Sequence, residues 1–291
     1  MMKTVRCAII DLQSGSARSV SVSADGKFVW AVCCEDGCCM DGAVTLSTGP
    51  LTGMGVPGGS GMTWHLNNKY YPAEGRVASA LRFAGWDHLV LTGKCPEGTK
   101  ADITIHGEDI AVKLVSASAR ETAHGVYAKV MKARPNGASV ILVPAQNGMM
   151  EDDCFLVSAR GVSAELRAMG VRSLTVSGEG ALAVADPAAL RALCVDLWLE
   201  VKGWKNNSDA EHPARYLSVM PGAGLEMPAE WGKCLYQQGS DAQILAAMGL
   251  CWGSCAEKLG GVEMAAKLLA ACTGEAADLQ QCVMVKGGCA K

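Results

Sequence analysis

Charged residues are scarce in this chain of 291 residues, because Asp, Glu, Lys and Arg together make up only 19%. The formal net charge of −3 provides no basic surface for nucleic acid or for an anionic membrane. No run approaches the roughly 18 consecutive apolar residues that span a bilayer. The opening apolar run is too short and interrupted for a signal peptide. The sequence therefore predicts a cytoplasmic protein with neither nucleic-acid nor membrane partners.

Aromatic residues are also few, at 5%, whereas the chain contains 34 Gly and 14 Cys. Its apolar content of 49% suits a globular chain with room for one large or two modest domains. Without an export signal, the cysteines are expected to be free thiols or metal ligands rather than disulfides. Four of them surround a turn, where hairpin cysteines and a metal site both remain open: Cys33, Cys34, Cys38 and Cys39.

The pattern of apolar residues predicts an α+β domain followed by helices. Strands are expected at 4–10, 16–23, 28–33, 43–46, 88–91, 101–106, 110–116, 139–143 and 172–176. Helices are expected at 76–83, 118–133, 163–169, 187–202, 240–249, 254–259, 262–272 and 275–284. We predict an antiparallel-sheet domain with inserted helices over residues 1–182 and a small, cysteine-rich all-α domain over 183–291.

Glycines and prolines gather between residues 49 and 61, just after the expected strand 43–46. Glycine at this density indicates positive φ angles or a close approach that a side chain would block. One interpretation is a long surface loop between strands. The other is a cradle in which backbone amides and the helix beginning near Arg76 bind a flat or phosphate-bearing ligand.

Two blocks of this region resemble a known family. TGPLTG at 48–53 is followed by Gly58 and Gly59, and LRFAGWD at 81–87 by LVLTGK at 89–94. The order and spacing are similar to those in the N-terminal domain of tungsten-containing aldehyde ferredoxin oxidoreductases. The resemblance covers residues 1–180 well and about 240–260 faintly. It implies that family's N-terminal fold, a tungsten- or molybdenum-pterin, an iron–sulfur cluster and an anaerobic source.

The resemblance also implies site residues. Pterin contacts are expected at Gly49, Gly53, Gly58, Gly59, Gly75, Arg76, Arg160 and Gly161. Arg76 could hold a phosphate through a bidentate contact or be a surface residue in the first turn of a helix. Cys251 and Cys255 align with the cluster motif C-x2-C-x3-C, and the alternative is that they pack in a helical core. Further thiols that could complete a cluster or zinc site are Cys234, Cys272, Cys282 and Cys289.

Several positions depart from the family pattern. Pro72 stands where the family has an Asn at the magnesium that bridges the two pterin phosphates, and a proline side chain has no ligand oxygen. Met248 stands at the first cluster cysteine, and a thioether is a poor iron ligand. Glu165 and Arg167 replace small or apolar residues, and the family continues beyond the position of Lys291.

These departures favour a truncated, diverged family member that is non-catalytic and either binds a pterin cofactor or acts as an accessory subunit. Its expected assembly is a homodimer or a complex with an oxidoreductase partner. One alternative is an active tungsten- or molybdenum-pterin oxidoreductase acting on aldehyde or oxo groups, with an iron–sulfur protein as acceptor. The other is a thiol-rich metal-binding or redox protein. His65, His88 and Glu74 lie in or near the glycine-rich region, and His88 is the candidate for proton chemistry.

Overall fold

The structure is a computed structural model, and it describes only part of the chain. The described residues are 4–23, 42–56, 58–66, 69–118, 122–143, 149–151, 154–156, 160–205, 248–250 and 260–274. Among the predictions, those for the strand at 28–33, the four cysteines of residues 33–39 and the helices at 254–259 and 275–284 lie outside these residues.

The first sheet contains six strands in the order β2-β1-β6-β3-β4-β5. Their bounds are β1 Thr4–Asp11, β2 Ser16–Ser23, β3 Val44–Thr48, β4 Gly61–Leu66, β5 Lys69–Glu74 and β6 His88–Thr92. Helix α2, Arg76–Phe83, connects the edge strand β5 to β6 at the middle of the sheet. β6 pairs parallel with β1 and antiparallel with β3, so this sheet is mixed.

The second sheet also contains six strands, in the order β11-β10-β9-β12-β7-β8. Its elements are β7 Thr99–His106, β8 Asp109–Ser116, α3 Ala123–Ala133, β9 Ser139–Leu142, β10 Met149–Glu151, β11 Cys154–Leu156, α4 Arg160–Met169 and β12 Val171–Ser177. β12 pairs parallel with β7 and antiparallel with β9. The strand order and pairing directions are those of the first sheet, with β7 in the place of β1 and β12 in the place of β6.

This shared topology coincides with a repeat in the sequence. Leu81-Arg82, Gly85, Leu89 and Gly93 recur 85 residues later, at positions around α4 and β12: Leu166-Arg167, Gly170, Leu174 and Gly178. The first glycine of each set has a positive φ, 85° at Gly85 and 89° at Gly170, where the chain turns from helix to strand. The α+β part of the chain is therefore built from two similar halves.

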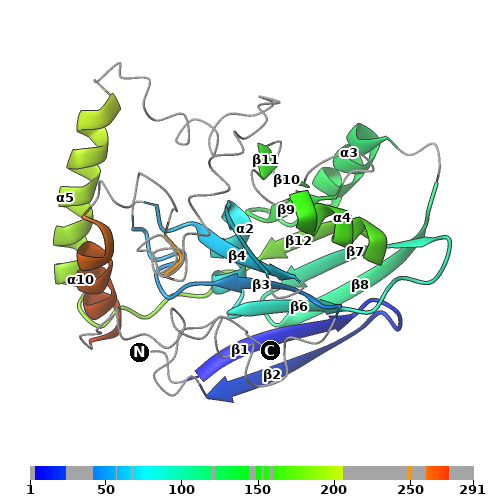
Figure 1. The fold of residues 1–291 in the computed structure, drawn as a ribbon, viewed down its shortest axis with the longest axis horizontal. Helices are drawn as coiled ribbons and strands as arrows, with labels where there is room; N and C mark the ends of the chain where they lie inside the picture. The colour runs from blue at the N-terminus through cyan, green and yellow to red at the C-terminus, as the bar shows by residue number, and fades with distance from the viewer. Residues whose placement is uncertain are drawn as a thin grey trace.

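The two sheets share one core with helices α2 and α4 between them (Figure 1). Helix α2 contacts β3 of the first sheet and β9 and β12 of the second. Fully buried side chains from both sheets and both helices meet there, including Trp64, Leu81, Ile103 and Val162. Helix α3 covers the opposite face of the second sheet through Val126.

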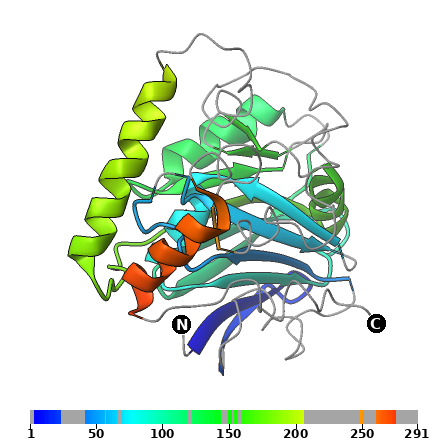
Figure 2. The ribbon, with the colours of Figure 1, turned by 60° about the vertical axis from the view of Figure 1, so that its left-hand side comes forward.

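Two helices form a second, smaller core at one side of the sheets (Figure 2). Helix α5, Pro187–Lys205, begins where the sequence predicts, because Asp186 Oδ1 accepts a hydrogen bond from the Ala189 amide at 2.9 Å. Helix α10, Gly261–Thr273, packs against it. Leu51 and Met248 also belong to this core. Among the described helices, none combines the length and the hydrophobicity needed to cross a membrane.

The α+β class and most of the expected elements are confirmed, but the expectation of antiparallel sheets is wrong because both sheets are mixed. The strands β4 and β5 lie in a region that was interpreted as loop, although Met62, Trp64 and Leu66 alternate toward the core. Helix α3 begins at Ala123, five residues later than the capping box at Ser118 predicted, with Thr122 as its N-cap. Helix α4 begins three residues earlier than expected, at Arg160. The domain boundary at residue 182 remains a prediction.

Candidate functional site

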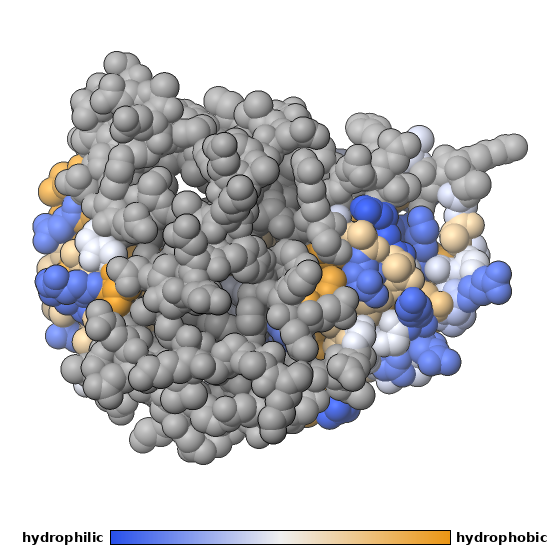
Figure 3. Space-filling model, in the orientation of Figure 1, coloured by the Kyte–Doolittle hydropathy of each residue, from blue (hydrophilic) through white to orange (hydrophobic). Residues whose placement is uncertain are grey.

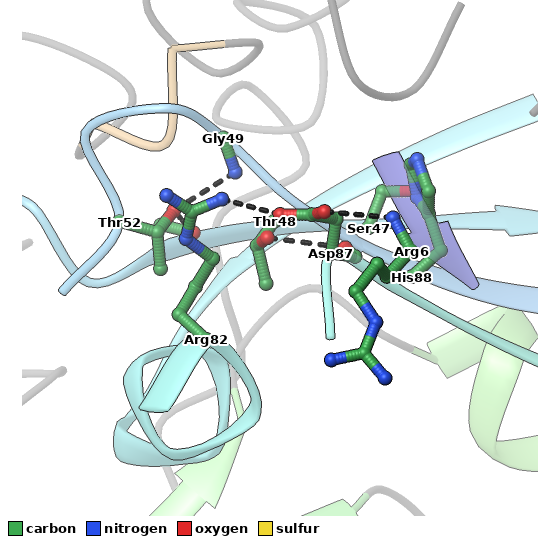
Figure 4. Close-up of polar contacts among 9 residues, drawn as sticks. Arg6, Ser47, Thr48, Gly49, Thr52, Arg82, Asp87 and His88 are labelled. Atoms are coloured by element: carbon green, nitrogen blue, oxygen red, sulfur yellow. Dashed lines mark hydrogen bonds and ion pairs between the residues drawn. The ribbon is translucent and has the colours of Figure 1, made fainter. Parts of the chain in front are cut away.

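The glycine-rich loop between β3 and β4 is closed around the side chain of Thr52. The Gly49 amide donates a hydrogen bond to Thr52 Oγ1 at 2.9 Å, and Thr52 Oγ1 donates to the Gly61 carbonyl at 2.8 Å. Thr52 is fully buried. One threonine hydroxyl thus joins the two ends of the loop, and Figure 4 shows it beside Gly49.

Most of the loop amides also donate within the chain. The Thr52 amide donates to the Gly49 carbonyl at 3.0 Å, and the Gly53 amide donates to the Gly59 carbonyl at 2.8 Å. The Gly59 amide in turn donates to the Val56 carbonyl at 2.8 Å. A phosphate cradle needs several amides that point into open space. Most of the described amides of this loop instead donate to carbonyls of this chain or to the Thr52 hydroxyl.

Residues 248–250 pack against the glycine-rich loop. The Leu51 amide donates to the Met248 carbonyl and the Gly61 amide to the Gly249 carbonyl, both at 2.9 Å. A Cβ built on Gly49 would lie 2.1 Å from the Gly249 nitrogen, and one built on Gly61 would lie 2.7 Å from the Gly249 carbonyl carbon. The glycines therefore permit a close approach, as expected, but the segment that approaches belongs to this chain.

The other predicted cofactor residues lie around this loop and in the second half. Gly75 precedes α2, and its amide donates to the Ser60 carbonyl at 3.1 Å. Arg76 is exposed in the first turn of α2. Arg160 and Gly161 form the first turn of α4, the helix that corresponds to α2 in the other half. Gly58 lies in the loop with a φ of 75°. The predicted metal ligands Cys251 and Cys255 lie outside the described residues.

A second cluster joins the end of α2 to three strands of the first sheet. Asp87 forms an ion pair with Arg82, and Asp87 Oδ2 accepts a hydrogen bond from the Arg6 amide at 2.9 Å. The Asp87 carbonyl accepts from both the amide and the hydroxyl of Thr48, at 3.0 and 3.1 Å. Figure 4 shows Arg82 reaching from α2 to these strand ends. Burial raises the pKa of the Asp87 carboxyl, and the smaller opposing effect of Arg82 lowers it.

The face of the first sheet that points away from the shared core carries buried polar side chains beside a small apolar cluster. It carries Thr45, Ser47, Thr63, His65 and His88. His88 is fully buried, and its Nδ1 lies 2.8 Å from the Ser47 hydroxyl. Cys7 is the neighbour of His88 on the parallel strand β1. Thr45 Oγ1 is buried and has no hydrogen-bond partner among the residues that the structure describes. Thus the ring of His88, the candidate for proton chemistry, is oriented by a contact with the Ser47 hydroxyl.

These residues differ in the chemistry that they can perform. Asp87 is a buried carboxyl with a raised pKa, which is a property of many proton-transfer groups. Here its oxygens are engaged by Arg82 and Arg6, so it orients strands rather than pointing at an open pocket. In the described part of the chain, no group of three or more His, Cys, Asp or Glu could hold a metal ion.

The implied pterin does not fit the glycine-rich loop as the described residues are arranged. Most of the described loop amides, which could otherwise bind its phosphates, already donate to the Gly49, Leu51, Val56, Gly59, Met248 and Gly249 carbonyls and to Thr52 Oγ1. The space beside Gly49 is occupied by backbone atoms, which cannot rotate away as a side chain can. Met248, at the position of the first cluster cysteine, is fully buried in the helical core. We therefore derive no chemistry through a pterin or a cluster.

The chain matches no known protein-family model and no curated protein sequence. It shares its fold with BamB in a structure described as the active site complex BamBC of benzoyl coenzyme A reductase in complex with 1,5-dienoyl-CoA. The TM-score is 0.59 at 17% sequence identity over 72% of this chain. The chain spans about a third of the length of that protein, because the match covers 36% of it. At this identity the likeness concerns the fold alone.

Sequence reasoning missed three residues on which the site depends. Thr52 and Asp87 both lie in the two sequence blocks that resemble the family, 48–53 and 81–87, but the sequence alone suggested no role for either residue. Gly249 was overlooked because its contact, Gly49, lies 200 positions away in the chain. The signal for Asp87 was available, since an acidic residue directly before a buried strand, five residues after Arg82, needs a partner.

Proposed function

We propose that this chain is a non-catalytic partner subunit of an oxidoreductase complex, built on the N-terminal fold of the aldehyde ferredoxin oxidoreductase family. The observation that carries the proposal is the closed glycine-rich loop. Most of its described amides donate within the chain and residues 248–250 lie against it, so that it stabilises the junction of two cores. A loop used in this way has lost the donors that cofactor binding requires.

Two further features support a non-catalytic role. Pro72 replaces the family's magnesium-associated Asn, and Met248 replaces a cluster cysteine and lies buried among leucines. Each change removes a donor from a site rather than exchanging it for another. The fold match concerns BamB, which is described within a two-component complex named BamBC, and this favours a role beside another subunit.

The test is the metal and pterin content of the chain purified without oxygen, first alone and then as the complex isolated from its native source. Tungsten, molybdenum, iron, zinc and phosphorus are measured together with an absorption spectrum. We expect any tungsten- or molybdenum-pterin to remain with the partner when the complex is dissociated. Near-stoichiometric tungsten or molybdenum with phosphorus on the isolated chain would overturn the proposal and favour the active oxidoreductase. Zinc alone, or iron with a broad visible band, would instead favour the thiol-rich metal protein.

A further inference from the structure

Helix α5 has two apolar faces, and among the described residues only one of them is buried against other parts of the chain. Leu190 and Leu197 are buried against the core that α5 shares with α10. On the opposite face, Val195 and Leu199 are 49% and 61% exposed, and Trp198 beside them is 55% exposed. These are three of the four large exposed hydrophobic residues in the described part of the chain. Exposed apolar side chains gathered on one face of a helix indicate an interaction site.

Four residues on the outer face of α5 are spaced as in a helix that packs along a second helix, and we call this row of residues the seam. Ala188, Ala192, Val195 and Leu199 follow one another at intervals of four, three and four residues, and all are exposed. This is the a/d pattern with which one helix packs along another. Figures 1 and 2 show α5 along one edge of the molecule, and Figure 3 shows apolar surface at that edge. The seam is therefore placed where a second helix could reach it.

We propose that α5 pairs with α5 of a second copy of this chain, in antiparallel orientation about a two-fold axis. In this arrangement Ala188 faces Leu199 of the second copy, and Ala192 faces Val195 of the second copy. Each contact occurs twice, as a two-fold interface requires. Small residues thus meet large ones at every level of the seam, which is the condition for close packing without cavities or clashes.

The charges beside the seam favour the same arrangement. Arg191 is exposed on the flank of the seam that also carries Trp198. In the antiparallel pair, Arg191 lies over the Trp198 ring of the second copy, which is a favourable cation–π arrangement, and the contact occurs twice. Asp196 lies on the other flank and meets Ala189 of the second copy rather than another acid. Antiparallel helices also oppose their macrodipoles.

The size of the seam sets the expected affinity. A pair of helices with four seam residues each buries less accessible surface than a standard stable interface, which buries about 1,200 Å² or more. We therefore expect a reversible dimer with a dissociation constant in the micromolar range, on the order of 10 μM. This inference does not depend on the proposed function, because it concerns a surface remote from the glycine-rich loop.

The test is sedimentation equilibrium of the 291-residue chain over a wide concentration range. The wild-type chain should pass from monomer to dimer. Leu199→Glu, which places two charges in the seam, should raise the dissociation constant about a hundredfold. Leu114→Glu is the matched control, since Leu114 is an exposed leucine on β8 away from α5, and it should leave the constant unchanged. Far-UV circular dichroism verifies that each variant is folded.

A pair of size exchanges tests the orientation. Ala188→Leu alone should weaken the antiparallel dimer about tenfold, because two leucines then meet at one level. Ala188→Leu combined with Leu199→Ala should restore the dimer, because large and small residues again face each other. A wild-type chain that stays monomeric at all concentrations, as expected if residues 206–247 cover the seam, would overturn the proposal. So would a dimer that is indifferent to Leu199→Glu or that tightens with Ala188→Leu.

Discussion

Gly49 and Gly249 pack backbone against backbone, so closely that a Cβ on Gly49 would lie 2.1 Å from the Gly249 nitrogen. A Cβ on Gly249 would lie 2.1 Å from Thr52 Oγ1, the hydroxyl that closes the glycine-rich loop. This contact joins the core between the sheets to the core of α5 and α10. The stability of both parts should therefore depend on two glycines.

Gly49→Ala and Gly249→Ala should each lower the free energy of unfolding by about 3 kcal/mol, because backbone atoms must move to admit the methyl group. Urea denaturation measures this loss. Gly55→Asn is the control: Gly55 has a φ of 73° in open space, and asparagine tolerates that conformation. An alanine at position 49 without loss of stability would show that residues 248–250 do not lie against the loop.

Asp87 should make the stability of the chain depend on pH. Because burial raises its pKa above the ordinary value of 3.8, the folded state retains a proton that the unfolded state has already released. This contribution is complete below the unfolded pKa and is lost as pH rises through the folded pKa. The stability advantage of the wild-type chain over Asp87→Asn should therefore shrink as pH rises from acidic to neutral, as urea midpoints can measure. An advantage that grows instead would show that the ionised pair with Arg82 outweighs burial.

The ion pair in the second half should contribute more than one on the surface. Arg172 Nε donates to Asp102 Oδ1 at 2.8 Å, and the Ser173 hydroxyl donates to the same oxygen at 2.6 Å. Asp102→Ala should cost about 3 kcal/mol, because a largely buried guanidinium loses its carboxylate. Glu263→Ala breaks the exposed pair with Lys267 and should leave the unfolding free energy almost unchanged, because solvent screens this pair. Equal losses of unfolding free energy in Asp102→Ala and Glu263→Ala would show that burial does not strengthen the pair of Asp102 with Arg172.

Cys272 should be a slow nucleophile. Burial, together with the nearby Cys194, raises its pKa to about 11. At pH 8 only about one thiol in a thousand is then ionised, and the thiolate is the reactive form. Alkylation at pH 8 followed by mass spectrometry should show Cys272 reacting about a hundredfold more slowly in the native chain than in the denatured chain, which is roughly the ratio of the two thiolate fractions. Because the pKa is raised, stability from this group is lost as pH rises from 9.0 toward 11.

A fast reaction of Cys272 at pH 8 would place it in contact with solvent or with a further cation. Cys95 and Cys194 also have pKa values raised by burial, so they are expected to react slowly as well. Buried thiols of this kind behave as small apolar residues of the core. Cys7 is also fully buried, beside His88 on the neighbouring strand.

Local patterns in the sequence were sufficient to locate most elements. The helix at 76–83 and the strand at 88–91 follow from apolar periodicity, and Asp186-Pro187 marks the start of α5 through capping chemistry alone. Strands β4 and β5 were missed because the glycines of the loop before them hid a short alternating run. The repeat of Leu81-Arg82 and Gly85 at 166–170 was present in the sequence and predicts the two similar halves.

What the sequence determined by itself was the α+β class, the boundaries of most helices and the positions that need glycine, because these depend on neighbours within a few residues. Only the tertiary structure decided what lies against those glycines. The parallel pairing of β1 with β6 and the approach of Gly249 to Gly49 join segments about 80 and 200 positions apart. A glycine leaves room for a ligand or for backbone equally well, and the atoms that use the room are chosen by the packing of the whole chain.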